Sequence, residues 1–320
     1  MLPNAMAAGT SGATILKYFP GPRNNSLADT GVSITEDFNS SSYNPAALGT
    51  VSGYNISALY YSAFSDANVG YLAAGKDIGP GSLAIKGLGY FGGNITIKDL
   101  YEPELDGKTF TSQQDFVFSL GYGLKIMPGA YTGVNIKYYQ STLIEQYNTQ
   151  SYVIDAGVIV KSGLFKIGQP RIVTEWYSEG LNIGAAALNI GQKISYTDSG
   201  QKDPLPFMLR GGLSYPLRFN PVHSILITAD AADVNESDTI KGGAGLEYIN
   251  NETFFVRAGY KINYDIKHFT WGLGFKYDNY SLDYGMGVNT AIGSEHNVLF
   301  SMKFGSAPRA VQSDYMRRSR

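Results

Sequence analysis

The chain has 320 residues, of which 43% are hydrophobic and 16% are charged, and this composition excludes a disordered polymer. Glycine reaches 38 residues and tyrosine 24, a combination typical of strands that alternate aromatic and small side chains. With 25 basic and 27 acidic residues the net charge is −2, so charge gives no support to nucleic-acid binding.

The chain begins MLPNAMAAG, which has the alanine-rich end of a signal-peptide cleavage site but not the basic and apolar regions that precede one. We interpret this start as the mature end left after removal of a signal peptide, although it does not by itself decide export. No run approaches the roughly 20 consecutive apolar residues of a membrane-spanning helix. Helical insertion into a membrane is therefore excluded.

Residues 41–49, SSYNPAALG, contain both a start and a stop signal for one short helical turn. Asn44 can cap the turn, and Pro45 suits its first position. Gly49 suits a left-handed exit from it. The residues between them are apolar, so we expect one short apolar turn immediately before the first strand.

Four segments near the C-terminus alternate strictly between apolar and polar or small residues. In residues 254–262, Phe254 and Val256 lie on one face, while Arg257 and Lys261 lie on the other. Similar but noisier segments extend back to Tyr54, which gives about twelve to fifteen candidate strands. No candidate helix of about ten or more residues separates them, which argues against a parallel βαβ architecture.

Such a meander fits a soluble sandwich or barrel with its apolar faces inward, or a transmembrane barrel with its apolar faces toward lipid. The polar faces are dominated by glycine, which favours a crowded lumen over a solvated surface. Aromatic residues at strand ends, such as Trp271 and Tyr280, suit the two membrane interfaces. We therefore predict an all-β fold, a transmembrane antiparallel β-barrel of about 14 strands over residues 51–305, in contact with outer-membrane lipid.

Residues 8–23, AGTSGATILKYFPGPR, followed by YNPAALG, resemble the N-terminal region of PorV/PorQ-type outer-membrane proteins, which are distant relatives of the FadL long-chain fatty acid transporters. The segments YSLDYGMG and HNVLFSMKF also resemble the last strands of that family. The resemblance implies a location in the bacterial outer membrane. It also implies that residues 1–50 fold back into the barrel as a plug, although a turn across the periplasmic mouth is an alternative. The plug turn would comprise Tyr43, Asn44, Pro45, Ala46, Ala47 and Leu48.

Charged residues on the polar strand faces are predicted to line the lumen. They could pair with one another and hold the plug, or they could select a solute. These residues are Lys125, Lys137, Arg257, Lys261, Lys276, Asp278, Asp283 and Lys303.

The sequence gives little support for catalysis or for metal binding. The absence of cysteine excludes thiol catalysis and cysteine-ligated metal, and His223, His268 and His296 lack partners at ligand spacing. The acidic segments at 99–106 and 233–238 match no calcium-loop pattern. We expect no metal, no cofactor and no enzymatic activity.

The last residues, 306–320, come after the final aromatic strand position, Phe304, and show no periodic pattern. An even strand count would place this tail in the periplasm. The tail is either solvated and disordered or a basic hook for an acidic partner. The basic residues of the hook would be Arg309, Arg317, Arg318 and Arg320.

Two functions remain open from the sequence. The resemblance to PorV-like proteins implies a partner- or cargo-binding barrel in a protein secretion or surface assembly of the type IX kind. The relation to FadL implies instead a channel for hydrophobic small molecules. A channel needs a continuous apolar pocket beside the plug, whereas a docking barrel needs apolar extracellular loops.

Overall fold

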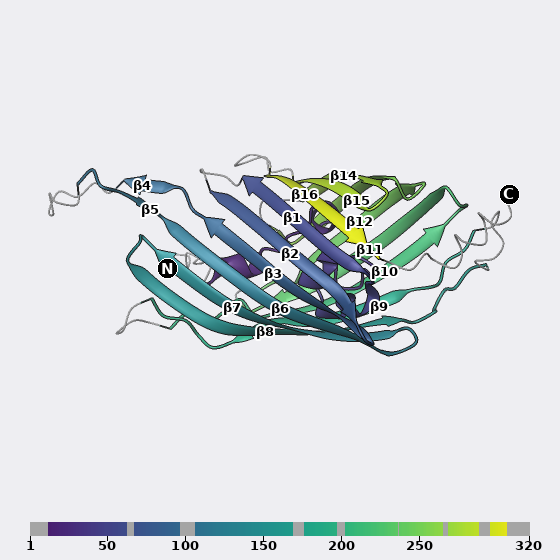
Figure 1. Cartoon of the computed structure of the whole chain (residues 1–320), viewed down its shortest axis with the longest axis horizontal. Helices are drawn as coiled ribbons and strands as arrows, with labels where there is room; N and C mark the ends of the chain where they lie inside the picture. Colours follow the sequence, from purple (N-terminus) through teal and green to yellow (C-terminus); the bar gives the residue numbers. More distant parts are fainter. Residues whose placement is uncertain are drawn as a thin grey trace, which may run out of the picture.

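The computed structural model describes residues 12–62, 67–96, 106–168, 176–196, 202–235, 237–264, 268–287 and 295–305. Within these ranges, fourteen strands form one closed antiparallel barrel, in which each strand pairs with the next barrel strand and β1 pairs with β16. Figure 1 shows the barrel with the purple N-terminal segment inside it. The predicted antiparallel barrel is therefore confirmed.

The barrel strands are β1 (Tyr54–Ser62), β2 (Asn68–Ile78), β3 (Gly81–Phe91), β6 (Gln113–Met127), β7 (Ala130–Leu143), β8 (Tyr147–Lys161), β9 (Asn182–Gly191), β10 (Met208–Arg218), β11 (His223–Val234), β12 (Lys241–Asn250), β13 (Phe254–Ile262), β14 (Phe269–Tyr277), β15 (Tyr280–Gly287) and β16 (Glu295–Phe304). A separate two-stranded sheet pairs β4 (Asn94–Thr96) with β5 (Thr109–Thr111). The helices are η1 (Thr14–Lys17), α1 (Pro22–Ser26), η2 (Asn39–Ser42) and η3 (Pro45–Thr50). In the part of the chain that the structure describes, no helix has the length and apolar character needed to cross a membrane.

The strand faces that were predicted to meet lipid point outward. Phe254, Val256 and Leu273 are 56%, 52% and 49% exposed. On the opposite face of β13, Arg257 and Lys261 are buried. The alternation of residue types therefore separates a lipid-facing surface from the interior, as the period of two predicts.

The two ends of the barrel differ in their connections. Two-residue turns at 79–80 and 278–279 lie at one end, where Tyr54 at the start of β1 also pairs with Phe304 at the end of β16. Strands β4 and β5, which come between β3 and β6 in the chain, lie at the other end. Outer-membrane barrels keep short turns in the periplasm and longer loops outside the cell. We therefore assign the end with the two-residue turns to the periplasm.

Residues 12–50, termed the inner segment, lie inside the barrel (Figure 1). Helix α1 packs against β13 to β16, while η3 packs against β3, β6, β7 and β8. Leu27, Val32 and Leu48 of this segment are fully buried. Because the wall side chains of a wide barrel cannot fill its lumen, the inner segment supplies much of the core.

Inward-facing glycines let the inner segment approach the backbone of the wall. A Cβ atom added to Gly245 would lie 2.7 Å from the Cβ of Leu27, and one added to Gly259 would lie 2.7 Å from the carbonyl carbon of Leu27. Such distances leave no room for a side chain. The glycine-rich polar faces seen in the sequence therefore mark places where the wall contacts the inner segment.

Candidate functional site

The Asn-Pro turn at the end of the inner segment is η3. Asn44 is extended, with φ −152° and ψ 113°, and its Oδ1 accepts a hydrogen bond from the amide of Ala46 at 3.0 Å. Its Nδ2 donates to the carbonyl of Val32 at 2.7 Å and to that of Val158 in β8 at 3.0 Å. Asn44 therefore caps the turn and also links the inner segment to the barrel wall.

The structure corrects the role expected of Gly49. This residue does not adopt a left-handed conformation but lies within η3, and the turn ends at Val51 with φ −93°. A Cβ atom on Gly49 would lie 2.9 Å from the backbone of Leu124 in β6. Glycine is required here by the closeness of the wall and not by a turn exit.

The predicted turn residues are all buried inside the barrel. Tyr43, Ala46, Ala47 and Leu48 have no exposed surface, and Asn44 and Pro45 are buried as well. The ring of Tyr43 lies 4.7 Å from that of Phe19, and burial raises the pKa of its hydroxyl well above the usual value. The turn is thus buried against the wall strands β3, β6, β7 and β8.

Four of the predicted lumen charges lie inside the barrel and form ion pairs. Arg257 bonds Glu247 and Asp283, each at 2.6 Å. Lys137 pairs with Asp155 at 2.7 Å. Lys261 pairs with Asp29 of the inner segment.

Arg23 extends this set of charges into the inner segment. Its guanidinium contacts Glu247 at 2.6 Å and Asp37 at 3.5 Å. Arg23, Asp37, Glu247, Arg257 and Asp283 therefore form one connected network between α1 and the strands β12, β13 and β15. Sequence reasoning did not single out Arg23 or Glu247. The useful signal was a glutamate on the glycine-rich face of residues 241–250.

Asp230 in β11 forms a second buried contact with the inner segment. Its Oδ2 accepts hydrogen bonds from the amides of Gly31 at 2.7 Å and Val32 at 3.0 Å. Arg210 lies 3.8 Å from the same carboxylate and donates to the carbonyl of Asp29 at 2.6 Å. This contact and the Arg23 network both lie on the β10 to β15 side of the wall.

The other predicted lumen charges lie near the periplasmic rim. Lys125, Lys276 and Asp278 are exposed, and Lys303 is half-buried. Lys125, Lys276 and Asp278 therefore do not lie in a crowded interior, whereas the half-buried Lys303 stays a predicted lumen charge. The tail arginines, Arg309, Arg317, Arg318 and Arg320, lie outside the described residues.

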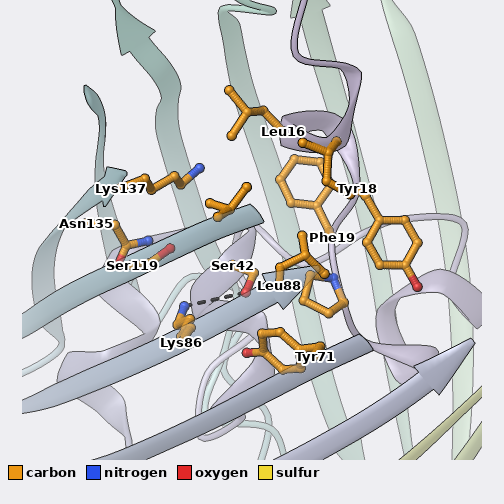
Figure 2. Close-up of a pocket in the computed structure, with 13 residues that line it drawn as sticks. Leu16, Tyr18, Phe19, Ser42, Tyr71, Lys86, Leu88, Ser119, Asn135 and Lys137 are labelled. Atoms are coloured by element: carbon orange, nitrogen blue, oxygen red, sulfur yellow. Dashed lines mark hydrogen bonds between the residues drawn. The ribbon is translucent and has the colours of Figure 1, made fainter. Parts of the chain in front are cut away.

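Two cavities lie beside residues 15–19 of the inner segment. The larger, of about 430 Å³, is termed the vestibule. It is lined by Tyr18 and Phe19 of the inner segment, by Tyr61 and Tyr90 near the extracellular ends of β1 and β3, and by charged groups such as Asp115. The smaller, of about 40 Å³, is shown in Figure 2 and shares Tyr18 and Phe19 with the vestibule. Residues 15–19 of the inner segment therefore line a mixed polar and aromatic vestibule and the smaller cavity beside it.

Metal-binding groups do not gather in the described part of the chain, where no three histidine, aspartate or glutamate side chains are placed to hold an ion. The ring Nδ1 of His223 lies 2.7 Å from the hydroxyl of Tyr248, and that of His296 lies 2.7 Å from the hydroxyl of Tyr284. The nearest polar partners of these two histidines are tyrosines.

Comparison with known families identifies the relationship. The family model described as "Type IX secretion system protein PorV" matches residues 5–236. The chain belongs to the PorV family. No curated protein matches it in sequence.

This PorV-family barrel also shares its fold with solved transporters. The toluene transporter TbuX of Ralstonia pickettii is 14% identical, with a TM-score of 0.58 over 89% of this chain and 98% of TbuX. The toluene transporter TodX of P. putida is 10% identical, with a TM-score of 0.54 over 90% of this chain and 99% of TodX. At these identities the likeness concerns the fold alone. The family match gives the PorV-family chain its context, an outer-membrane barrel of a secretion system.

Proposed function

We propose that this PorV-family chain is a closed, non-enzymatic barrel that binds a protein partner or cargo at its extracellular face, within a secretion or surface assembly of the type IX kind. The observation that carries the proposal is the buried inner segment, whose Arg23 contacts Glu247 of the wall at 2.6 Å. A filled lumen leaves the extracellular rim as the surface available for function. The tail stays either a solvated segment or a predicted basic hook for an acidic periplasmic partner.

The extracellular rim has features suited to protein binding. The β4–β5 hairpin extends beyond the barrel wall (Figure 1). Phe91 at its base and Ile95 within it are 42% and 40% exposed. Glu145 in the turn between β7 and β8 accepts a hydrogen bond from the amide of Thr111 at 2.9 Å, which links β5 to the neighbouring rim. Exposed apolar side chains on a supported hairpin favour contact with another protein.

Uptake of a hydrophobic small molecule is the second candidate. The vestibule favours it, because its volume of about 430 Å³ and its aromatic side chains suit a small ligand. Its walls also carry Lys17, Asp29, Asp115 and Lys261, and charged walls are a poor match for an apolar solute such as toluene. The partner-binding function is therefore preferred.

Deletion of the gene in the producing organism, with two readouts, tests the proposal. We expect the deletion to remove a set of proteins from the cell surface or medium and to leave uptake of labelled toluene unchanged. The intact chain should restore secretion, and a chain with residues 93–111 replaced by a short glycine-serine linker should not. Intact secretion combined with lost toluene uptake would contradict the proposal and favour the channel.

A further inference from the structure

The small cavity between the inner segment and the wall contains a buried cation without a counter-ion. Lys86 of β3 is 8% exposed, and its Nζ has one hydrogen bond, to the Oγ of Ser42 at 3.4 Å. No carboxylate of the described residues lies within 4.0 Å of it. Lys137, which lines the same cavity, instead has Asp155 at 2.7 Å.

This arrangement sets Lys86 apart from the other buried cations. Arg210, Arg257 and Lys261 each lie within ion-pair distance of a carboxylate. Removing an ammonium group from water is costly unless an opposite charge accompanies it. The cavity therefore holds a buried lysine that no carboxylate of the described residues pairs with.

Tyr71 of β2 gives an independent indication at the same place. Its side chain is 3% exposed, lines the cavity, and its hydroxyl has no hydrogen-bond partner. Figure 2 shows the Lys86 ammonium and the Tyr71 hydroxyl both directed toward Ser42. A buried hydroxyl without a partner is uncommon and costs free energy. Donors from two strands and from the inner segment thus converge at one end of the cavity.

Beyond the polar side chains of Ser119, Asn135 and Lys137, the rest of the cavity wall is largely apolar. Leu16 and Phe19 of the inner segment, together with Leu88 and Val117 of the wall, line it. A bare halide or a phosphate would place unshared electron pairs against these side chains. An anion with one charged end and one carbon end matches both parts of the wall.

We propose that this cavity binds a small monocarboxylate. The Lys86 ammonium acts as its counter-ion, the hydroxyls of Tyr71 and Ser42 donate to its oxygens, and the short alkyl end packs against Leu88 and Val117. The volume of about 40 Å³ limits the ligand to a few heavy atoms. Tyr18 and Phe19 line both this cavity and the vestibule, so the two adjoin.

Calorimetric titration of the full-length barrel in detergent with sodium propionate tests the proposal. Propionamide, which has the same shape without the charge, and sodium chloride are titrated in parallel. We expect saturable propionate binding and at least about tenfold weaker binding of both comparators, because the charged carboxylate end is what the donors recognise. Propionamide or chloride binding as tight as that of propionate would overturn the assignment.

Two variants locate the site. Lys86→Met should weaken propionate binding about tenfold or more, and Tyr71→Phe about two- to tenfold through the loss of one hydrogen bond. Lys125→Met, at the exposed periplasmic rim, is the matched control and should bind like the parent chain. If Lys86→Met does not fold, propionate binding by Tyr71→Phe alone tests the site, because this variant keeps the ring and removes only the hydroxyl. Unchanged propionate binding by Tyr71→Phe and by a folded Lys86→Met would overturn the proposal.

Discussion

Arg23 of the inner segment and Glu247 of β12 form a two-bond ion pair inside the barrel, with Nε to Oε2 at 2.9 Å and Nη2 to Oε1 at 2.6 Å. The Glu247 side chain has no exposed surface. Breaking a buried pair typically costs about 3 to 5 kcal/mol when the remaining charge is left uncompensated. Arg257 still contacts Glu247 at 2.6 Å after the change, so we expect Arg23→Met to lower the free energy of unfolding by a smaller amount, about 1 to 3 kcal/mol, for the lost hydrogen bonds of a buried group, measured by urea unfolding of the barrel in detergent or lipid.

A second pair between the inner segment and the wall provides the control. Lys161 lies 3.3 Å from Glu36, and their side chains are 22% and 38% exposed. Exposed pairs contribute about 0 to 1 kcal/mol, so Lys161→Met should change stability little. Equal losses for Arg23→Met and Lys161→Met would show that burial of the Arg23 pair is not what stabilises the inner segment.

Two adjacent glycines of β10 test how closely the inner segment packs. A Cβ atom on Gly212 would collide with Oδ1 of Asp230 and lie 3.1 Å from the Cβ of Val32, whereas one on Gly211 would meet nothing within 4 Å. We expect Gly212→Ala to destabilise the barrel by about 1 to 3 kcal/mol through overpacking. Gly211→Ala should change stability by less than about 1 kcal/mol. Thermal unfolding of both variants checks this, and similar melting temperatures would contradict the close packing of the inner segment against β10.

The outward face of β14 tests the membrane position. Leu273 lies near the middle of the strand and Tyr277 at its periplasmic end, and they are 49% and 72% exposed on the same face. Lysine at the bilayer midplane costs about 2 to 4 kcal/mol, and near an interface about 0 to 1 kcal/mol. Leu273→Lys should therefore impair folding into lipid vesicles much more than Tyr277→Lys. A larger effect at Tyr277 would contradict the assigned depth.

Glu145 makes the contact between β5 and the neighbouring rim depend on pH. Hydrogen bonds from the amide and hydroxyl of Thr111 lower the pKa of the Glu145 carboxyl below its ordinary value. A lowered pKa means that the ionised carboxylate stabilises this contact above the usual glutamate pKa of about 4.3. The contribution is lost as the pH falls through the lower pKa of the folded protein.

The amide chemical shift of Thr111, followed by NMR against pH, measures this effect. Its midpoint should lie below about 4.3, and the transition should vanish in Glu145→Gln. A midpoint at or above that value would mean that the carboxylate does not accept a bond from the rim.

The barrel faces could be predicted from the sequence because strand alternation is a local property. Alternation within each strand predicts that Leu273 of β14 faces outward and Arg257 of β13 faces inward, and the structure places them so. Whether the inner segment covers an inward-facing side chain is not a local property, because the two come from distant parts of the chain. Lys276 has the inward register of its strand but is exposed beside the turn at 278–279.

The partners inside the barrel could not be predicted, because they come from distant parts of the chain. Arg23 and Glu247 are 224 positions apart, and no turn or period in the sequence connects them. Gly49 shows the same limit. The residues around Gly49 predict the end of a helical turn, but the close approach of β6 is the reason that glycine is present.

The central claim is that the folded inner segment closes this PorV-family barrel. Single-channel conductance of the intact chain in planar lipid bilayers tests it most directly, with Arg23→Met recorded beside it. An empty barrel of this strand number would enclose a water-filled lumen. We predict no steady open-channel current from the intact chain and intermittent openings from Arg23→Met. A steady, porin-like current from the intact chain would contradict the claim.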